Sequence, residues 1–310
     1  MDGTIRFKDA FQNVRNHFGI VNAINLIALP RIAARFPGAN ISYNNRLRKF
    51  IRVMIGDIID KYRNDPLYLP DSKTNSTIWS LWWQGKNNMP EVVELCRESV
   101  MRNSRGNNVI ILNKDNYTDY ITLPTFIVDR QEKKEISLSH LSDIIRVGLL
   151  SMYGGIWLDS CLCAVKSITQ TDRMRMPRFE TNSSPNLGKW CFGAISTPSG
   201  HKLMRYMYDC LLRYWEKYDS AIDYLMFDSI MMIAYEEFPD IKEEIDTFQI
   251  SSPNLHETRY SFSEIVNKKQ FNKIIHDNSL LSLTWRINYP KAIGASETYY
   301  GALCKLVYGK

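Results

Sequence analysis

The sequence predicts an α/β fold whose central sheet is Rossmann-like and mostly parallel. The prediction rests on short, fully apolar runs that recur along the chain and on the helical patterns that lie between them. This alternation is typical of strands that helices cover on both faces. The chain has 310 residues, of which 45% are hydrophobic, which is enough for one large domain with an appended region.

The first 70 residues are predicted to be helical, with breaks at Pro30 and at Phe36–Asn40. A turn-rich connection at Asp65–Asp71 follows them. We therefore divide the chain into a basic helical region, residues 1–70, and an α/β domain, residues 71–310.

Strands and helices alternate in this second part. Ile78–Trp83, Val109–Leu112 and Ile156–Leu158 are apolar runs and are predicted as strands. Helices are predicted at Pro90–Met101, which begins with proline, and at Ser139–Tyr153, which has one apolar face and ends before two glycines. C-terminal helices are predicted within Gly200–Phe238, with an interruption near Ser220, and the tail from Leu280 is mixed and aromatic.

The net charge of +6 lies entirely in residues 1–70, which hold 11 basic and 5 acidic side chains. The remaining residues are balanced, so the chain does not have the evenly basic composition of a nucleic-acid-binding protein. Residues 31–63 alone hold eight basic and two acidic side chains, with apolar residues at helical spacing between residues 47 and 62.

This basic amphipathic pattern has two interpretations. The helix either packs on the α/β domain and turns a solvated basic face outward, or it lies on an anionic membrane surface. No uncharged apolar run approaches about 18 residues, so no transmembrane helix is expected. The six cysteines form no CxxC pair and the start does not resemble a signal peptide, so we expect a cytoplasmic chain, peripheral on the inner face of the plasma membrane in the second interpretation.

The most informative segment is SDIIRVGLLSMYGGIWLD, residues 142–159. Asp143 and Arg146 are three residues apart on a predicted helix, so their side chains point the same way. Asp159 ends an apolar strand, where open α/β sheets bind ligands. The glycines between them, Gly154 and Gly155, permit a sharp turn and a close approach to a ligand.

This segment resembles the donor-sugar motif of bacterial capsular polysaccharide synthesis proteins. These are similar to glycosyltransferases with a DxD sugar-binding region, of the type of the mannosyltransferases and the glucosylating clostridial toxins. The resemblance extends over about residues 78–167 and includes Ile78–Gly85 and Asn113–Tyr117. It implies an A-type glycosyltransferase fold, a nucleotide-sugar donor, most commonly a UDP-sugar, and retention of the anomeric configuration.

The resemblance also implies roles for individual residues. Asp143 would bond to donor-sugar hydroxyls, Arg146 would contact the sugar or the diphosphate, and Asp159 would contact ribose and sugar. Charge-assisted hydrogen bonds of this kind are strong. Trp83 is the nearest match to the tryptophan beside the base, with Trp82 as the alternative register. Further donor-binding positions implied are Gln84, Gly154 and Gly155.

The sequence departs from the DxD pattern, because Asp159 is followed by Ser160 and Cys161. The missing second carboxylate is the usual ligand of Mn²⁺ or Mg²⁺, and a cysteine sulfur replaces it poorly. Either Asp159 binds a divalent cation with help from a late residue such as His256, or Arg and Lys side chains balance the leaving diphosphate alone.

Asp223 and Asp228 flank Tyr224–Phe227 and are weaker candidates for acceptor binding. Their simpler interpretations are a helix cap for Asp223 and a solvated helix face for Asp228. We expect a hexosyltransferase that moves a sugar from a nucleotide-sugar to a growing capsular or exopolysaccharide glycan, lipid-linked or oligosaccharide. The alternative is a non-catalytic relative that binds a nucleotide or glycan and acts as a scaffold in polysaccharide assembly.

Overall fold

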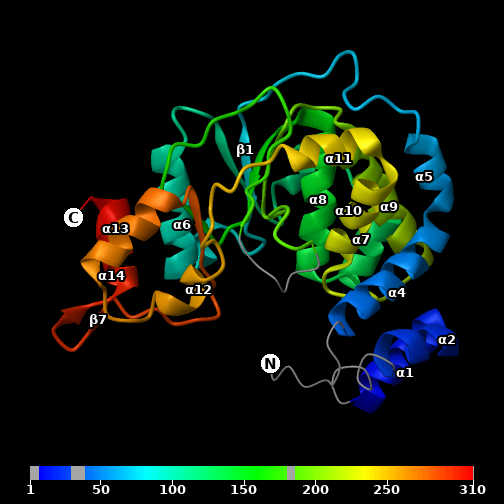
Figure 1. Cartoon of the computed structure of the whole chain (residues 1–310), viewed down its shortest axis with the longest axis horizontal. Coiled ribbons are helices and arrows are strands. Elements are labelled where there is room, and N and C mark those ends of the chain that lie inside the picture. Colours follow the sequence, from blue (N-terminus) through cyan, green and yellow to red (C-terminus); the bar gives the residue numbers. More distant parts are fainter. Residues whose placement is uncertain (1–6, 29–38, 180–185, 310) are drawn as a thin grey trace.

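The computed structural model describes residues 7–28, 39–179 and 186–309, which have a mixed α/β architecture (Figure 1). The central sheet has four strands, in the order β2 (Val109–Leu112), β1 (Ile78–Leu81), β3 (Gly155–Leu158) and β5 (Ala194–Thr197). The first three strands are parallel to one another, and β5 is antiparallel to β3. The predicted α/β class with a mostly parallel sheet is therefore confirmed.

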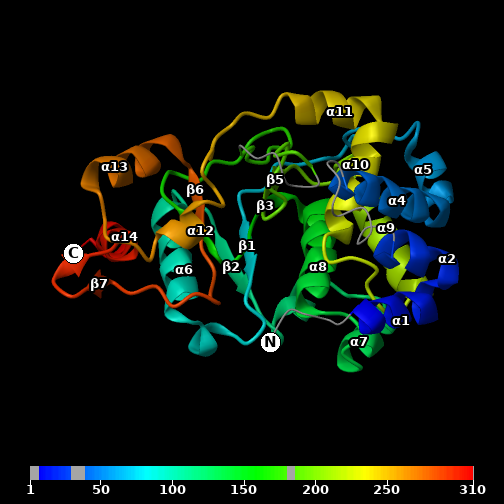
Figure 2. The ribbon, with the colours of Figure 1, turned by 60° about the horizontal axis from the view of Figure 1, so that its bottom comes forward.

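Helices cover both faces of this sheet, as Figure 2 shows. On one face, α8 (Leu138–Tyr153) packs on β3 and on α9 (Lys202–Lys217), which in turn contacts α10 (Met226–Glu237). Large side chains such as Trp157 and Trp215 are fully buried in this layer. The layer also contains η3 (Tyr117–Asp119), α7 (Thr125–Glu132) and α11 (Pro239–Asp246).

The other face is covered by α6 (Glu91–Asn103) and the C-terminal α14 (Tyr299–Tyr308), which pack on each other. A second, two-stranded sheet joins β4 (Leu162–Ala164) to β6 (Leu280–Ser282) in antiparallel register, which brings the C-terminal part next to the turn that follows Asp159. The remaining elements there are η2 (Lys86–Asn88), α12 (Thr258–Ser261), α13 (Lys268–Asp277), β7 (Ala292–Ile293) and β8 (Ser296–Glu297).

The N-terminal helices pack on the first face. They are α1 (Phe7–Phe18), α2 (Ile20–Ala23), the π-helix η1 (Ile24–Ala28), α4 (Ala39–Met54) and α5 (Gly56–Tyr62). α4 packs on α10 and α5 on α9. Leu47, Ile51 and Ile55 recur at helical spacing and are buried in the same core as α8–α10. The helical layer and residues 71–310 therefore share one hydrophobic core across the predicted boundary at residue 70.

The structure agrees with the first interpretation of the basic amphipathic pattern, because the apolar face of α4 and α5 is turned inward. Arg52 on α4 donates to Glu237 of α10 at 3.0 Å, and Lys61 on α5 donates to Asp209 of α9 at 2.7 Å. Residues 31–38, which begin the predicted basic segment, lie outside the described residues. Within the described residues, the helices are too short or too polar to span a bilayer.

Candidate active site

The connection between α8 and β3 determines which residues meet at the end of the sheet. Ser137 caps α8 by accepting a hydrogen bond from the His140 amide, and the helix ends at Gly154. The chain turns directly into β3, so the two elements run in opposite directions. The helix rises about 11 Å from Arg146 to its end, and the strand spans about 13 Å from its start to Asp159. Arg146 and Asp159 are therefore neighbours at the carboxyl edge of β3.

The glycine pair lies at the other, amino end of β3. Gly154 and Gly155 have φ values of 66° and 105°, a region that favours glycine. A Cβ on Gly154 would lie 2.5 Å from the Ser199 nitrogen, and one on Gly155 would lie 2.6 Å from the Thr77 oxygen. These contacts explain why both positions need glycine, and the assignment of both to donor binding stays a prediction. The two glycines let the chain turn tightly between neighbouring backbones, a strand's length away from Asp159.

Arg146 is the centre of the cluster at the carboxyl edge. Its guanidinium donates to Asp159 Oδ1 at 2.8 Å and to the Phe192 carbonyl oxygen at 2.8 Å, and it lies 3.4 Å from Asp143 Oδ1. Its side chain is only 3% exposed. The rings that face the guanidinium, with centroids 5.1–5.5 Å away, belong to Trp157, Phe192 and Phe227. Arg146 thus lies beneath the two carboxylates and holds them together; its direct contact with a sugar or diphosphate stays a prediction.

Asp159 is the member of the cluster that reaches the surface. Its side chain is 40% exposed, compared with 10% for Asp143. Its Oδ1 also accepts a hydrogen bond from Trp157 Nε1 at 2.8 Å. The neighbouring backbone is close, because a Cβ on Gly193 would lie 2.7 Å from Asp159 Oδ2. A ligand can therefore reach Asp159 while the rest of the cluster stays covered.

The buried carboxylates of the cluster are only partly neutralised. Burial raises the pKa of Asp143 to about 7, with the charges of Asp159 and Asp228 acting in the same direction and Arg146 opposing them. Burial likewise raises the pKa of Asp228 to about 6, although hydrogen bonds from Trp190 and Asn186 oppose the shift. The charge of Arg146 opposes the rise in the pKa of both Asp143 and Asp228 but does not outweigh their burial.

The two weaker acceptor candidates differ in position. Asp228, in the first turn of α10, is 4% exposed and accepts hydrogen bonds from Trp190 Nε1 at 2.8 Å and Asn186 Nδ2 at 2.9 Å. A solvated helix face does not fit this burial, so that interpretation of Asp228 is wrong, while its contact with an acceptor stays a prediction. Asp223 accepts hydrogen bonds from Tyr43 and from the Leu225 amide, both at 2.6 Å. The N-cap of α10 is Leu225, without a side-chain cap, so the capping interpretation of Asp223 is wrong: its carboxylate closes the turn before the helix.

A narrow crevice opens beside Asp159, between the carboxyl ends of β1 and β3 and the side of α6. Trp82, which follows β1, and Ser160 line it together with Asp159. Trp82 also faces the ring of Trp285, a residue that is 51% exposed and follows β6. The crevice joins the Asp159 carboxylate with the ring of Trp82, a combination that suits a sugar or a base. Its volume of about 10 Å³ gives room for about a single water molecule, so a sugar nucleotide would have to widen it or bind across its mouth.

The other two positions implied for donor binding lie near this crevice in sequence. Trp83 packs against the first-face core, with its ring 5.4 Å from that of Tyr117. Gln84 is exposed, and its carbonyl accepts a hydrogen bond from the Asn88 side chain. The choice between Trp82 and Trp83 as the base contact stays open, but it is Trp82 that lines the same crevice as Asp159.

The site offers a divalent cation few protein ligands. Among the described residues, no group of three or more His, Cys, Asp or Glu side chains is arranged to hold a metal ion. His256 is exposed and packs edge-on against Phe179, and partial desolvation together with the Arg259 charge lowers its pKa. Asp159 fits a cation that takes most of its ligands from substrate phosphates and water, a common arrangement for Mg²⁺. Metal binding by Asp159 and His256 stays a prediction.

Several residues of the site were not found from the sequence. Asn186, Trp190 and Phe192 come from the segment before β5, and Trp285 comes from the segment after β6. They follow no helix or strand period, and each meets the cluster across more than 30 residues of chain. The aromatic content of the tail from Leu280 was the only sequence feature that pointed toward Trp285.

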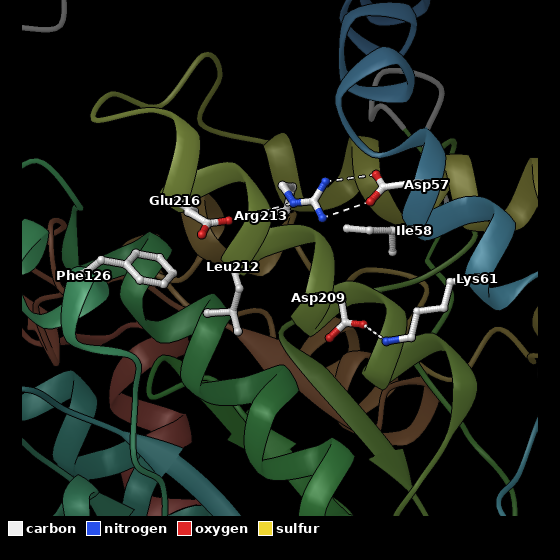
Figure 3. A pocket seen from close by; sticks show the side chains of 8 residues that line it. All are labelled: Asp57, Ile58, Lys61, Phe126, Asp209, Leu212, Arg213 and Glu216. Atoms are coloured by element: carbon white, nitrogen blue, oxygen red, sulfur yellow. Dashed lines mark hydrogen bonds and ion pairs between the residues drawn. The ribbon is translucent and has the colours of Figure 1, made fainter.

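A second concave region lies away from this cluster, between α5, α7 and α9 (Figure 3). Its charged side chains bind each other: Arg213 donates to both Asp57 oxygens at 3.0 and 2.9 Å, and Lys61 donates to Asp209. Each cation has its own carboxylate partner, and the pairs lie at the surface. The charged side chains that line this depression are thus engaged in surface ion pairs, and we do not assign it a catalytic role.

Comparison with known proteins supports the resemblance noted in the sequence. Residues 38–303 match the family model described as capsular polysaccharide synthesis protein. The search of curated proteins found no match. A solved structure titled PaToxG Glycosyltransferase is similar with a TM-score of 0.39 and 16% sequence identity, covering 65% of this chain and 82% of that chain. Because the family model spans most of the sequence, the chain belongs to the capsular polysaccharide synthesis protein family.

Proposed function

We propose that this member of the family is a glycosyltransferase that moves a sugar from a nucleotide-sugar to a growing glycan. The observation that supports it most is the convergence of Asp143, Arg146 and Asp159 at the carboxyl edge of a parallel sheet. Open α/β sheets bind ligands at that edge. The aromatic crevice beside Asp159 adds a surface for a base or a sugar ring.

The three residues take different roles in this proposal. Asp159, the exposed carboxylate, bonds to hydroxyls of the donor, and Asp143 bonds to a sugar hydroxyl from below. Arg146 keeps both carboxylates in place and offsets their charge. A preorganised arrangement of this kind favours the transition state because it needs no rearrangement as the glycosidic bond breaks.

The finer features of the proposal rest on the resemblance. They are an A-type glycosyltransferase fold, a UDP-hexose donor, retention of configuration, and a lipid-linked capsular or exopolysaccharide acceptor at the inner face of the plasma membrane. Contact with that membrane through residues 31–63 would rely mainly on exposed basic side chains, because most apolar side chains described in α4 and α5 are buried and Val53 is the large one that is exposed.

A divalent cation is part of the proposal, with Asp159 as its main protein ligand and His256 as a candidate second one. When bound, such a cation would supply positive charge to the leaving diphosphate. The donor set of the site favours a cation that the nucleotide brings with it over one held tightly by the free protein.

A screen of nucleotide-sugars tests the function directly. Thermal unfolding and release of free nucleoside diphosphate would be measured with UDP-, GDP- and dTDP-sugars, each with and without Mn²⁺. We expect one donor class to raise the unfolding temperature and to be hydrolysed slowly even without acceptor. Stabilisation without any release, also in the presence of glycan acceptors, would favour the alternative of a non-catalytic scaffold. No response to any donor would contradict both the transferase and a nucleotide-binding scaffold.

A further inference from the structure

The segment Asn186–Gly193 connects the first turn of α10 to the catalytic cluster. At one end, Asn186 and Trp190 both donate to Asp228 Oδ1. At the other end, the Phe192 carbonyl accepts from Arg146, and the Gly193 carbonyl accepts from the Asp159 amide at 2.8 Å. The same short segment therefore contacts a carboxylate on α10 and both members of the Arg146–Asp159 pair.

Hydrogen bonds within the segment make it a compact turn. Asn186 Nδ2 also donates to the Trp190 carbonyl at 3.0 Å, while Asn186 Oδ1 accepts from the Gly188 amide at 2.9 Å. Backbone bonds from the Cys191 amide to the Pro177 oxygen and from the Phe179 amide to the Gly188 oxygen also hold the turn, and Asp228 is the side-chain acceptor that ties it to α10. The side chains of Trp190 and Asp228 are buried, so water does not replace these bonds readily.

Packing couples the two ends further. Phe227, the residue before Asp228, lies against Phe192 with ring centroids 4.9 Å apart, and both rings face the Arg146 guanidinium. A shift of the turn away from Asp228 would thus move the Phe192 carbonyl and with it the guanidinium that orients Asp159.

We propose that Asp228 is a positioning residue, which fixes the segment Asn186–Gly193 and through it the geometry of Arg146 and Asp159. Asp228 is 4% exposed, and its Oδ1 already accepts two hydrogen bonds from the segment. The hydrogen-bond acceptor Oδ1 is the feature that matters for this role, because two donors meet on that single atom.

Substitutions at Asp228 separate this role from simple packing. Asp228→Asn keeps an oxygen where both donors need it, whereas Asp228→Leu keeps the size and removes the acceptor. Asp209→Asn on α9 is the control, because Asp209 accepts hydrogen bonds from Lys61 and Tyr62 of α5, away from the segment Asn186–Gly193. Amide hydrogen exchange of the full chain is measured for all variants, together with turnover of the donor found in the screen.

We expect Asp228→Leu to accelerate exchange at the amides of Asp159 and Gly188–Gly193 and to lower turnover about 10²-fold, the scale of a small misplacement of catalytic groups. Asp228→Asn and the control should resemble the wild type. Wild-type exchange and turnover in Asp228→Leu, or equal defects in Asp228→Asn and Asp228→Leu, would overturn the proposal.

A second variant covers the case in which Asp228→Leu does not fold. Trp190→Phe keeps an aromatic ring and removes one donor to Asp228, so it should give a smaller increase in exchange confined to the same amides; unchanged exchange there would overturn the proposal. Only the turnover readout rests on the proposed function. If the wild type acts on no donor, that function fails, while hydrogen exchange still decides the role of Asp228.

Discussion

The helical layer on α9 and α10 and the carboxyl edge of the sheet both contain ion pairs, but they arrange them differently. In the layer, Arg213 has Asp57 and Lys61 has Asp209, each at the surface. At the sheet edge, the carboxylates of Asp143 and Asp159 share the buried guanidinium of Arg146, and the charge of the buried Asp228 helps to raise the pKa of Asp143. Surface pairs contribute little to stability, whereas an uncompensated buried charge is costly. An arrangement that costs stability and borders a crevice through Asp159 is the better candidate for a functional site.

Removal of Arg146 should have the largest effect of any change in these two regions. Arg146→Met leaves the carboxylates of the cluster without their cation, and the free energy of unfolding should fall by about 3–5 kcal/mol at pH 8. The difference in the free energy of unfolding between variant and wild type should be smaller at pH 5, because the buried carboxyl groups are then protonated. Urea unfolding at both pH values measures this difference. Equal stability of variant and wild type would show that the cluster does not depend on the Arg146 guanidinium.

Neutralisation of the carboxylates should affect turnover and spare the fold. Asp143→Asn and Asp159→Asn should each lower turnover about 10²-fold or more, the scale of one lost transition-state contact. Circular dichroism and unfolding temperature serve as controls for folding. Rates close to those of the wild type in both variants, with a donor that the wild type uses, would mean that the site lies elsewhere.

The pH dependence of stability should differ between the wild type and Asp143→Asn. Burial raises the pKa of Asp143 from 3.8 to about 7, so the folded state binds this proton more tightly than the unfolded chain. The contribution of Asp143 to stability is therefore greatest at low pH and falls as the pH rises from about 4 to about 7. Asp143→Asn should gain unfolding temperature relative to the wild type across that window, and a constant difference from pH 4 to 8 would contradict the shifted pKa.

Disruption of a surface pair in the helical layer should have the smallest effect. Arg213→Met breaks the two bonds to Asp57 at the surface depression of Figure 3 and should cost at most about 1 kcal/mol, with turnover unchanged. The same urea experiment measures it. A loss as large as that of Arg146→Met would remove the contrast between the two regions.

The fold was predictable from the sequence where the local pattern was strong. Val109–Leu112 is the strand that its apolar run predicts, and the helix predicted from Ser139 begins at Leu138. β5 was not predicted, because its four residues follow a segment without period and its position depends on antiparallel pairing with β3. Short strands of this kind are specified by the neighbours that they meet.

The site was predictable in its centre but not in its surroundings. Asp143, Arg146 and Asp159 belong to one continuous helix–turn–strand unit, so their approach follows from local geometry. The contacts of Asp228 with Asn186 and Trp190 span about 40 residues, and nothing in their spacing indicates them. The role of the glycine pair was not decided by the sequence, because its backbone conformation suits a ligand site and a tight turn equally well.

The central claim is that Asp143, Arg146 and Asp159 form the place where an activated sugar is held. The most direct test is a crystal structure with a nucleotide-sugar that the screen identifies. The account predicts sugar hydroxyls within about 3.2 Å of the Asp159 and Asp143 carboxylates, with the nucleotide in the crevice beside Trp82. A donor bound in the depression between α5, α7 and α9, or anywhere out of reach of Asp159, would contradict it.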